Sequence, residues 1–288
     1  MSDTIHRFLF DNDGIRGQLV KLEESAQRLI NGHQYPPFIA DLLFQAATIN
    51  ALLATSLKFE GRVSLQLQSS GPLKMLIVQT THELDYRGLA RFDEETDFTD
   101  FCFKDIVSQG HLAITIEPTQ GKRYQGIVPL DGETLTQCVE NYFMQSEQLA
   151  TRIWIFTNET QTCGLLLQAL PDMQDEKSFE HLGYLASTLS QAEALSESAA
   201  TLFHRLFHQE SVQYLSVNEV HFVCSCSQQK MLDSLNLLPK SEINEILSEE
   251  GFIEIKCEFC LDQFQFSEFE IKAHQKASQQ VNSNTTHH

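Results

Sequence analysis

Hydrophobic and polar residues alternate, or run together, in several short segments of the first 170 residues. In VSLQLQ (63–68), Val63, Leu65 and Leu67 fall on one face, which is the pattern of a strand with one buried side. Short apolar runs predict further strands at 73–78, 112–116, 126–130, 152–156 and 164–170. Turns that contain glycine separate these runs.

Helical periodicity is interleaved with these strands. The segment 38–57, FIADLLFQAATINALLATSL, is apolar on most sides, so we expect a long and largely buried helix. An amphipathic helix is predicted after Asp131 from the spacing of Leu135, Cys138, Val139, Tyr142 and Phe143. Together these patterns predict an α+β fold whose core domain, residues 1–171, has a mixed sheet and buried helices.

The pattern changes after Pro171. Residues 172–200 carry six acidic residues and one lysine, a net charge of 1 − 6 = −5. Two apolar stripes at helical spacing remain, and their members are Leu182, Leu185, Leu189 and Ala192, then Leu202, Phe203, Leu206 and Phe207. We therefore expect a helical linker over 172–217 that docks on the core domain through a thin apolar face and detaches at modest cost.

A compact unit is predicted over residues 218–275. A short strand, VHFVC, leads into a first cysteine pair, and residues 228–238 are helical. We expect Ser241 to cap a helix that ends at Gly251. Residues 252–257 form a strand that pairs with 263–266, and the polar residues 276–288 form a flexible tail.

Composition narrows the classes of function. The chain has 288 residues, 42% of them hydrophobic and 20% charged, with a net charge of −19. A surface of this charge repels a phosphate backbone, so we expect no nucleic-acid partner. The N-terminus lacks the pattern of a signal peptide, and no apolar run reaches ~18 residues, so we expect no membrane span and a cytoplasmic location.

Four of the seven cysteines lie in two short clusters, Cys224-Ser-Cys226 and Cys257-Glu-Phe-Cys260. Cytoplasmic thiols are normally reduced, and an odd total argues against a disulfide framework. Zinc prefers four thiolates in a tetrahedron, and paired cysteines on tight turns supply them two at a time. Residues 227–256 suffice for two short helices that bring the pairs together. We predict one zinc ion on Cys224, Cys226, Cys257 and Cys260.

The role of this metal is open from spacing alone. A unit of ~60 residues has a marginal core, and structural zinc contributes on the order of 10–16 kcal/mol of apparent binding energy. A purely structural site is therefore one interpretation. The C-x-C pair could instead close a small ring on oxidation, so metal binding and disulfide formation compete for the same sulfurs. A thioredoxin-like C-x-x-C lacks its strand and helix context. We expect His221 and His274 to be surface residues rather than ligands.

The cysteine clusters behind an acidic linker resemble the redox switch of the heat shock protein 33 family. The resemblance covers nearly the whole chain, through DNDGIRG (11–17), GPLKMLIV (71–78), HLAITI (111–116), YQGIVPL (124–130), YFMQSEQLATRIWIF (142–156) and CGLLLQALP (163–171). It implies an ATP-independent holdase chaperone of the stress response, not an enzyme. In the reduced state such a protein binds zinc and is inactive.

The same resemblance implies how the protein is activated. Oxidation pairs Cys224 with Cys226 and Cys257 with Cys260, zinc leaves, and the switch domain and linker unfold. Exposed apolar surface then binds unfolding client proteins, and the chain forms a homodimer. Candidate client-binding residues are Leu202, Phe203, Leu206 and Phe207, although an ordinary docking surface has the same pattern. The alternatives are a constitutive zinc-stabilised adaptor and a thiol–disulfide oxidoreductase that uses Cys257 and Cys260.

Other motifs are interpreted as structural. Cys102, Cys138 and Cys163 have apolar neighbours, so we expect them to be buried and inert. Arg16 lies between glycines and is expected to pair with a carboxylate. The cluster FDEETDFTDF (92–101) lacks the spacing of a calcium-binding EF-hand, which favours a solvated loop.

Overall fold

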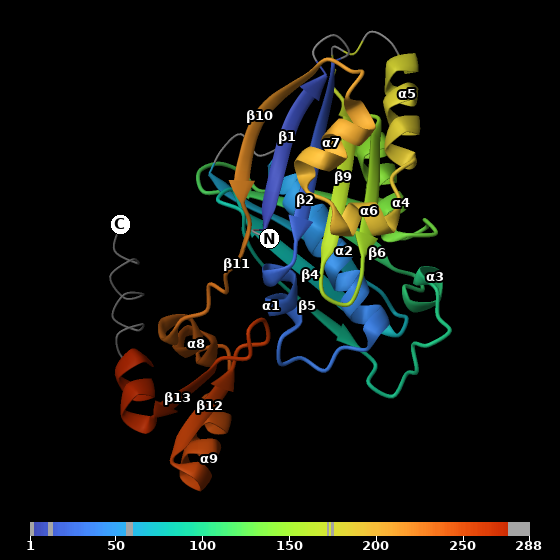
Figure 1. Cartoon of the computed structure of the whole chain (residues 1–288). Helices are drawn as coiled ribbons and strands as arrows, with labels where there is room; N and C mark the ends of the chain where they lie inside the picture. Colours follow the sequence, from blue (N-terminus) through green and yellow to red (C-terminus); the bar gives the residue numbers. More distant parts are fainter. Residues whose placement is uncertain (1–2, 11–13, 56–59, 172, 174–175, 276–288) are drawn as a thin grey trace. The chain divides into compact units, whose positions relative to one another are not determined.

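The structure, a computed structural model, describes residues 3–10, 14–55, 60–171, 173 and 176–275 (Figure 1). Contacts within the chain divide it into two compact units, Met1–Val223 and Cys224–His288. The boundary falls immediately before the first cysteine pair. The tail predicted at 276–288 lies outside the described residues.

A five-stranded antiparallel sheet forms one layer of the first unit. Its strands, in spatial order, are β10 (Val212–Glu219), β1 (Thr4–Phe10), β2 (Ile15–Leu22), β9 (Thr162–Ala169) and β8 (Thr151–Thr157). Strands from the two ends of the unit thus meet, because β10 pairs with β1 and β9 pairs with β2.

A six-stranded sheet forms a second layer. Its order is β11 (His221–Phe222), β5 (Asp85–Phe92), β4 (Leu73–Thr81), β3 (Gly61–Gln68), β6 (His111–Pro118) and β7 (Tyr124–Pro129). All neighbours are antiparallel except β11, which runs parallel to β5, so the sheet is mixed as predicted. On β3 the side chains of Val63, Leu65 and Leu67 are buried, in agreement with their alternation.

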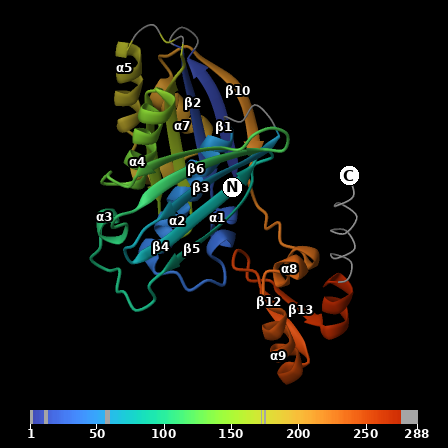
Figure 2. The ribbon, with the colours of Figure 1, turned by 180° about the vertical axis from the view of Figure 1, so that it is seen from behind.

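Helix α2 (Pro37–Ala54) packs against strands of both sheets and is almost entirely buried, as predicted (Figure 2). Pro37 occupies its first turn, where the missing N–H costs nothing. The helix is long and apolar enough to cross a membrane, but 72% of its apolar window is buried in this core. Its apolar character is therefore explained by packing. The short helix α1 (Glu24–Ile30) precedes it.

Three helices cover the other face of the five-stranded sheet (Figure 1). They are α5 (Glu176–Ser187), α6 (Gln191–Ser196) and α7 (Ala199–Phe207). The helical prediction for 176–207 is confirmed, but the first stripe is wrong at Ala192, which is exposed. The break between α5 and α6 changes the helical phase, so that α6 buries Ala194 and Leu195 instead.

The sequence pattern underestimates how much apolar surface these helices bury. Besides the predicted stripe residues, Phe179, Ala186 and Ala199 belong to the same buried cluster. From Val212 the chain is strand rather than helix, and it completes the sheet as β10. The end of the predicted linker range is therefore part of the sheet, because edge pairing with β1 satisfies its backbone groups.

Strands β1, β2, β5 and β10 were not predicted. In β1 a register shift at Arg7/Phe8 breaks the alternation. Gly17 lies within β2 rather than in a turn, and the ring of Phe8 fills the space where a Cβ would stand. Arg16 is also in β2, and it donates to the amide oxygen of Gln168 instead of a carboxylate.

Two further predictions concern the connections of the first unit. Helix α4 (Leu135–Tyr142) buries Leu135, Cys138, Val139 and Tyr142, as expected, and continues into the π-helical turn η1 (Phe143–Glu147). Residues 93–101 form an irregular loop, in which Phe98 is buried. The loop leads to the short helix α3 (Phe103–Ile106).

The second unit is small. Its elements are α8 (Gln228–Leu235), α9 (Lys240–Glu250), β12 (Phe252–Lys256), β13 (Gln263–Ser267) and a helix over 268–275. The predicted hairpin is confirmed, since β12 and β13 pair antiparallel. Ser241 is not the cap of α9, which begins at Lys240 after Pro239, whereas Gly251 ends the helix with φ +78°, as predicted. The buried core consists of Leu235, Ile243, Ile253, Phe266 and Ile271.

Candidate metal centre

The four predicted ligands come from two segments of the second unit. Cys224 and Cys226 lie in the extended chain between β11 and α8. Cys257 follows β12 directly, and Cys260 lies in the turn before β13. The β12–β13 hairpin therefore presents one pair at its tip, while the chain entering α8 presents the other. Cys257 is buried and the other three are partly buried.

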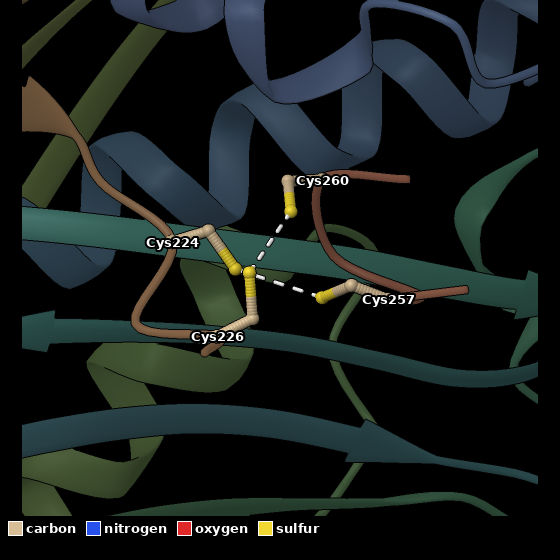
Figure 3. Close-up of side chains that lie close together, drawn as sticks. All are labelled: Cys224, Cys226, Cys257 and Cys260. Atoms are coloured by element: carbon tan, nitrogen blue, oxygen red, sulfur yellow. Dashed lines mark hydrogen bonds between the residues drawn. The ribbon is translucent and has the colours of Figure 1, made fainter. Parts of the chain in front are cut away.

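The four sulfur atoms converge on one point (Figure 3). All of them lie within 4.8 Å of one another. The Sγ atoms of Cys224 and Cys257 are 3.7 Å apart, and those of Cys226 and Cys260 are 3.4 Å apart. A zinc ion with Zn–S bonds of about 2.3 Å places its sulfurs about 3.8 Å apart, whereas a disulfide bond is about 2.05 Å long. The spacing fits a tetrahedral ion.

Backbone hydrogen bonds fix the turn that carries Cys257 and Cys260. The N–H of Cys257 donates to the carbonyl of Asp262 (2.9 Å), and the N–H of Leu261 donates to the carbonyl of Cys257 (2.8 Å). Leu261 takes a left-handed conformation with φ +63° to close this turn. Such a conformation is costly for a residue with a Cβ, so the surrounding contacts must hold it.

The turn with Cys224 and Cys226 is held by α8. Ser227 caps this helix by accepting from the N–H of Lys230 (3.3 Å). The Nζ of Lys230 reaches back to the carbonyl of Ser225 (2.6 Å), between the two cysteines. The partial positive charge at a helix N-terminus and the lysine both favour negatively charged sulfur nearby. Sequence reasoning missed Lys230, although its spacing after the cysteine pair, one helical turn into α8, is a usable indication.

Ionisation of one cysteine thiol in the cluster makes ionisation of its neighbours less favourable. Burial raises the pKa of Cys226 to about 11, with the negative charge of neighbouring thiolates as a further cause. Burial and the neighbouring thiols also raise the pKa of Cys260 above its usual range. Burial acts to raise the pKa of Cys224 too, but hydrogen bonds from the Cys226 N–H and the other thiols outweigh it and lower that pKa. A divalent cation would offset the repulsion between neighbouring thiolates. Four sulfur donors select a metal that prefers thiolate ligands.

The two histidines considered as ligands stand outside this cluster. His221 lies on β11 in the first unit and is exposed. His274 is not a surface residue as expected, because only 13% of its side chain is exposed. Its ring nitrogens contact the side chains of Asp233, Gln229 and Asn236. Among the described residues, no other group of three or more Cys, His, Asp or Glu side chains converges as these cysteines do.

The three cysteines outside the cluster differ in burial: two are buried and one is exposed. Cys138 and Cys163 are buried, as predicted, and burial raises the pKa of both thiols, that of Cys163 to about 12. Cys102 was expected to be buried but is exposed. It occupies the N-cap position of α3, where its N–H donates to Asp105 (2.7 Å). Capping keeps it at the surface although its neighbours are apolar.

The candidate client-binding residues lie in the core. Leu202, Phe203, Leu206 and Phe207 are each 8% exposed or less and pack against the five-stranded sheet. The ring of Phe203 meets that of Phe8 edge to face at a centroid distance of 4.5 Å. In this state they form a docking surface.

Comparison with known proteins identifies the family of this chain. The family profile described as "Hsp33 protein" matches residues 3–267. A 33 kDa chaperonin of Shewanella sp. (strain MR-4) is 40% identical over 274 residues, which are 95% of this chain and 96% of that protein. The 33 kDa chaperonin of Shewanella loihica is 41% identical over 272 residues, covering 94% and 95% of the two chains.

A solved structure gives the same picture of the fold. The crystal structure of the 33 kDa chaperonin, a heat shock protein 33 homologue, from Thermotoga maritima matches with a TM-score of 0.83. The match covers 96% of this chain and 99% of that one at 21% sequence identity. Taken with the family profile and the Shewanella relatives, it leads to one conclusion: the chain belongs to the Hsp33 family of chaperones.

Proposed function

We propose that this protein is an oxidation-activated, ATP-independent holdase that binds unfolding proteins in the cytoplasm during stress. The reduced form holds one zinc ion on Cys224, Cys226, Cys257 and Cys260 and is inactive as a chaperone. The observation that carries this proposal is the convergence of four sulfurs in a small unit, whose described residues form one apolar cluster of five buried side chains. When bound, zinc keeps these sulfurs as thiolates and ties the hairpin tip to the start of α8.

The chemistry of activation is oxidation of the four cysteines by a peroxide. In each pair, one sulfur is oxidised to a sulfenic acid, and the second thiolate displaces hydroxide from it to form the S–S bond. Each disulfide delivers two electrons and reduces one peroxide, so two disulfides consume two peroxides. A sulfur in a disulfide no longer carries the negative charge of a ligand, so the second unit loses the group that ties its segments together.

We propose the pairing Cys224–Cys226 and Cys257–Cys260. In the folded site two sulfur contacts run across the clusters, from Cys224 to Cys257 (3.7 Å) and from Cys226 to Cys260 (3.4 Å). Local pairing nevertheless closes much smaller loops, and loop closure costs less for short loops once the unit has opened. Mass spectrometry of peptides from the oxidised protein distinguishes the two patterns, and cross-cluster peptides would contradict the proposed pairing.

The linker supplies the apolar surface in this proposal. Helices α5 to α7 cover the five-stranded sheet, and their release uncovers Leu202, Phe203, Leu206 and Phe207 together with the sheet residues beneath them. The docked state is held partly by Lys21 of β2, whose Nζ donates to the carbonyls of Leu195 (3.1 Å) and Glu197 (2.5 Å) at the C-terminal end of α6. The net charge of −19 limits self-aggregation of the exposed form. We further propose that the activated chain is a homodimer and has no catalytic activity.

The experiment combines three measurements on the full-length chain. Peroxide is added to the reduced, zinc-loaded protein, zinc release is followed with a dye, and aggregation of a chemically unfolded client is followed by light scattering. We expect zinc release together with suppressed aggregation, both reversed by dithiothreitol, and a sedimentation shift to a dimer. Cys102→Ser removes the exposed cysteine outside the site and should behave as the wild type, whereas Cys257→Ser/Cys260→Ser should retain less zinc.

Other outcomes identify the alternatives. An adaptor with structural zinc keeps its metal under peroxide or gains no holdase activity after losing it. A thiol–disulfide oxidoreductase turns over many equivalents of a disulfide substrate. Unchanged metal content in Cys257→Ser/Cys260→Ser would contradict the assignment of the ligands.

A further inference from the structure

Two histidines lie one turn apart on the exposed side of α7. His204 and His208 are at positions i and i+4, and His208, which ends the helix, still has helical backbone angles (φ −63°, ψ −17°). Both are exposed, whereas Phe203 and Phe207 beside them face the sheet. Residues four apart on a helix are neighbours on its surface, so the two imidazoles stand side by side.

The separation of the two rings is the one that a shared metal ion requires. Their centroids are 5.4 Å apart and their planes are inclined by 44°. A zinc ion lies about 2.1 Å from a ligating imidazole nitrogen and hence roughly 3.2 Å from the ring centre, so rings sharing a tetrahedral ion have centres about 5.2 Å apart. The observed ring separation is close to this value, and the contact of the His208 Nε2 with the side-chain amide of Gln209 (3.5 Å) is the one that a bound ion would replace.

The surroundings of the pair also favour a cation. Both histidines lie in the last turn of α7, where the carbonyl end of the helix carries partial negative charge. They line a hollow of about 230 Å³ together with Glu210, whose Oε1 is paired with the Nε2 of His181 (3.0 Å). The nearest cation on the same helix, Arg205, is paired with Glu193 (2.9 Å) and Glu197 (3.4 Å) of the preceding helix and its C-cap.

We propose that His204 and His208 form a binding site for a divalent transition metal, with zinc as the ion tested, separate from the four-cysteine centre. Imidazole nitrogens are suitable ligands for zinc, copper and nickel. An ion held by residues i and i+4 is bound only while that turn is helical, so it stabilises the end of α7. Because the opposite face of α7 carries the proposed client-binding residues, the ion would also oppose their release; this consequence, unlike the site itself, rests on the proposed function.

The test is equilibrium dialysis of the reduced, zinc-loaded, full-length protein against increasing zinc. We expect the wild type to bind a second equivalent, and His204→Gln/His208→Gln to bind it more than about tenfold more weakly. The variant His208→Gln/Gln209→His keeps the number of histidines but moves the pair to i and i+5, and we expect the same loss. His111→Gln/His221→Gln removes two histidines elsewhere and should bind as the wild type does.

A second readout locates the ion. Amide hydrogen exchange in residues 199–208 should slow on zinc addition in the wild type and in His111→Gln/His221→Gln, but not in the two α7 variants. Binding of the second equivalent by His208→Gln/Gln209→His with wild-type affinity, or unchanged exchange in α7, would overturn the site. Neither measurement depends on chaperone activity, so its failure is distinguishable from failure of the proposed holdase function.

Discussion

The two units of this chain reach a folded state by different means. In Met1–Val223 two sheets enclose a buried helix, and a second layer of helices covers the outer face of one sheet. In the described part of Cys224–His288, residues 224–275, the buried core is a cluster of five side chains around one hairpin. The first unit can rely on apolar burial, at roughly 25 cal/mol per Å². The second buries much less apolar surface, which teaches that a unit of this size gains most from a further source of stability, and under the proposed function the four sulfurs supply it by binding zinc.

Under the proposed function, this contrast would explain how one chain contains both a stable body and a switch. A structure held by many distributed contacts loses stability gradually, whereas one held by a single site loses it when that site is altered. The predictions that follow test this difference between the units.

Removal of the metal should have the largest effect. Chelation of zinc from the reduced protein should abolish protection from amide exchange in α8, α9 and the β12–β13 hairpin, since structural zinc contributes on the order of 10 kcal/mol. The exchange pattern of α2 and the five-stranded sheet should not change. Slow exchange in β12 after complete metal removal would remove the basis of the comparison.

The same core substitution made in each unit should give different results. Phe8 and Phe266 are both fully buried. Phe8→Ala should lower the free energy of unfolding of the first unit by about 3–5 kcal/mol without changing zinc content. Phe266→Ala should leave the main urea transition unchanged and instead increase zinc loss to a competing chelator. Equal effects of the two variants on the main transition would mean that the units unfold together.

Alkaline pH should weaken the first unit through Cys163. Burial raises the pKa of this thiol to about 12 from an ordinary value of 9.0, so the folded state holds the proton more tightly. Stability is therefore unaffected below pH 9 and falls between pH 9 and 12, by about 1.4 kcal/mol per pH unit. Between pH 8 and 10.5, urea unfolding of Cys163→Ala should lose about 2 kcal/mol less than that of the wild type. Identical losses would show that Cys163 does not titrate on unfolding.

A backbone change in the second unit should have the smallest effect. Gly251 ends α9 with φ +78°, and no heavy atom lies within 4 Å of the position that a Cβ would take. Gly251→Ala should therefore cost only about 1 kcal/mol of backbone strain. Gly251→Asn should cost less, because asparagine tolerates the left-handed conformation. Zinc affinity measured by competition should therefore be highest for the wild type, lower for Gly251→Asn and lowest for Gly251→Ala. An equal affinity for all three proteins would contradict this prediction.

Several features could be predicted because they are encoded over short distances. The helix Pro37–Ala54, the alternation in 63–68 and the hairpin at 252–266 follow from local periodicity. The convergence of the four clustered cysteines follows from the spacing within each pair. Each of these depends on residues within a few positions of one another.

Other features could not be predicted because partners distant in sequence create them. Val212–Glu219 became a strand only through pairing with β1, about 200 residues earlier in the chain. Gln18 is 2% exposed within β2, and Arg16 beside it is held by Gln168, so polar residues interrupt a buried strand. Cys102 is exposed because it caps a helix that its apolar neighbours did not indicate.

The sequence alone therefore determined the class of the protein, the two cysteine pairs that meet and the acidic character of residues 172–200, since composition and short spacings carry that information. Only the tertiary structure decided which strands are neighbours, that α7 lies with its apolar face against the five-stranded sheet, and that the rings of His204 and His208 lie 5.4 Å apart. The physical reason is that burial and strand pairing depend on which distant segments meet, and local sequence does not specify the partner.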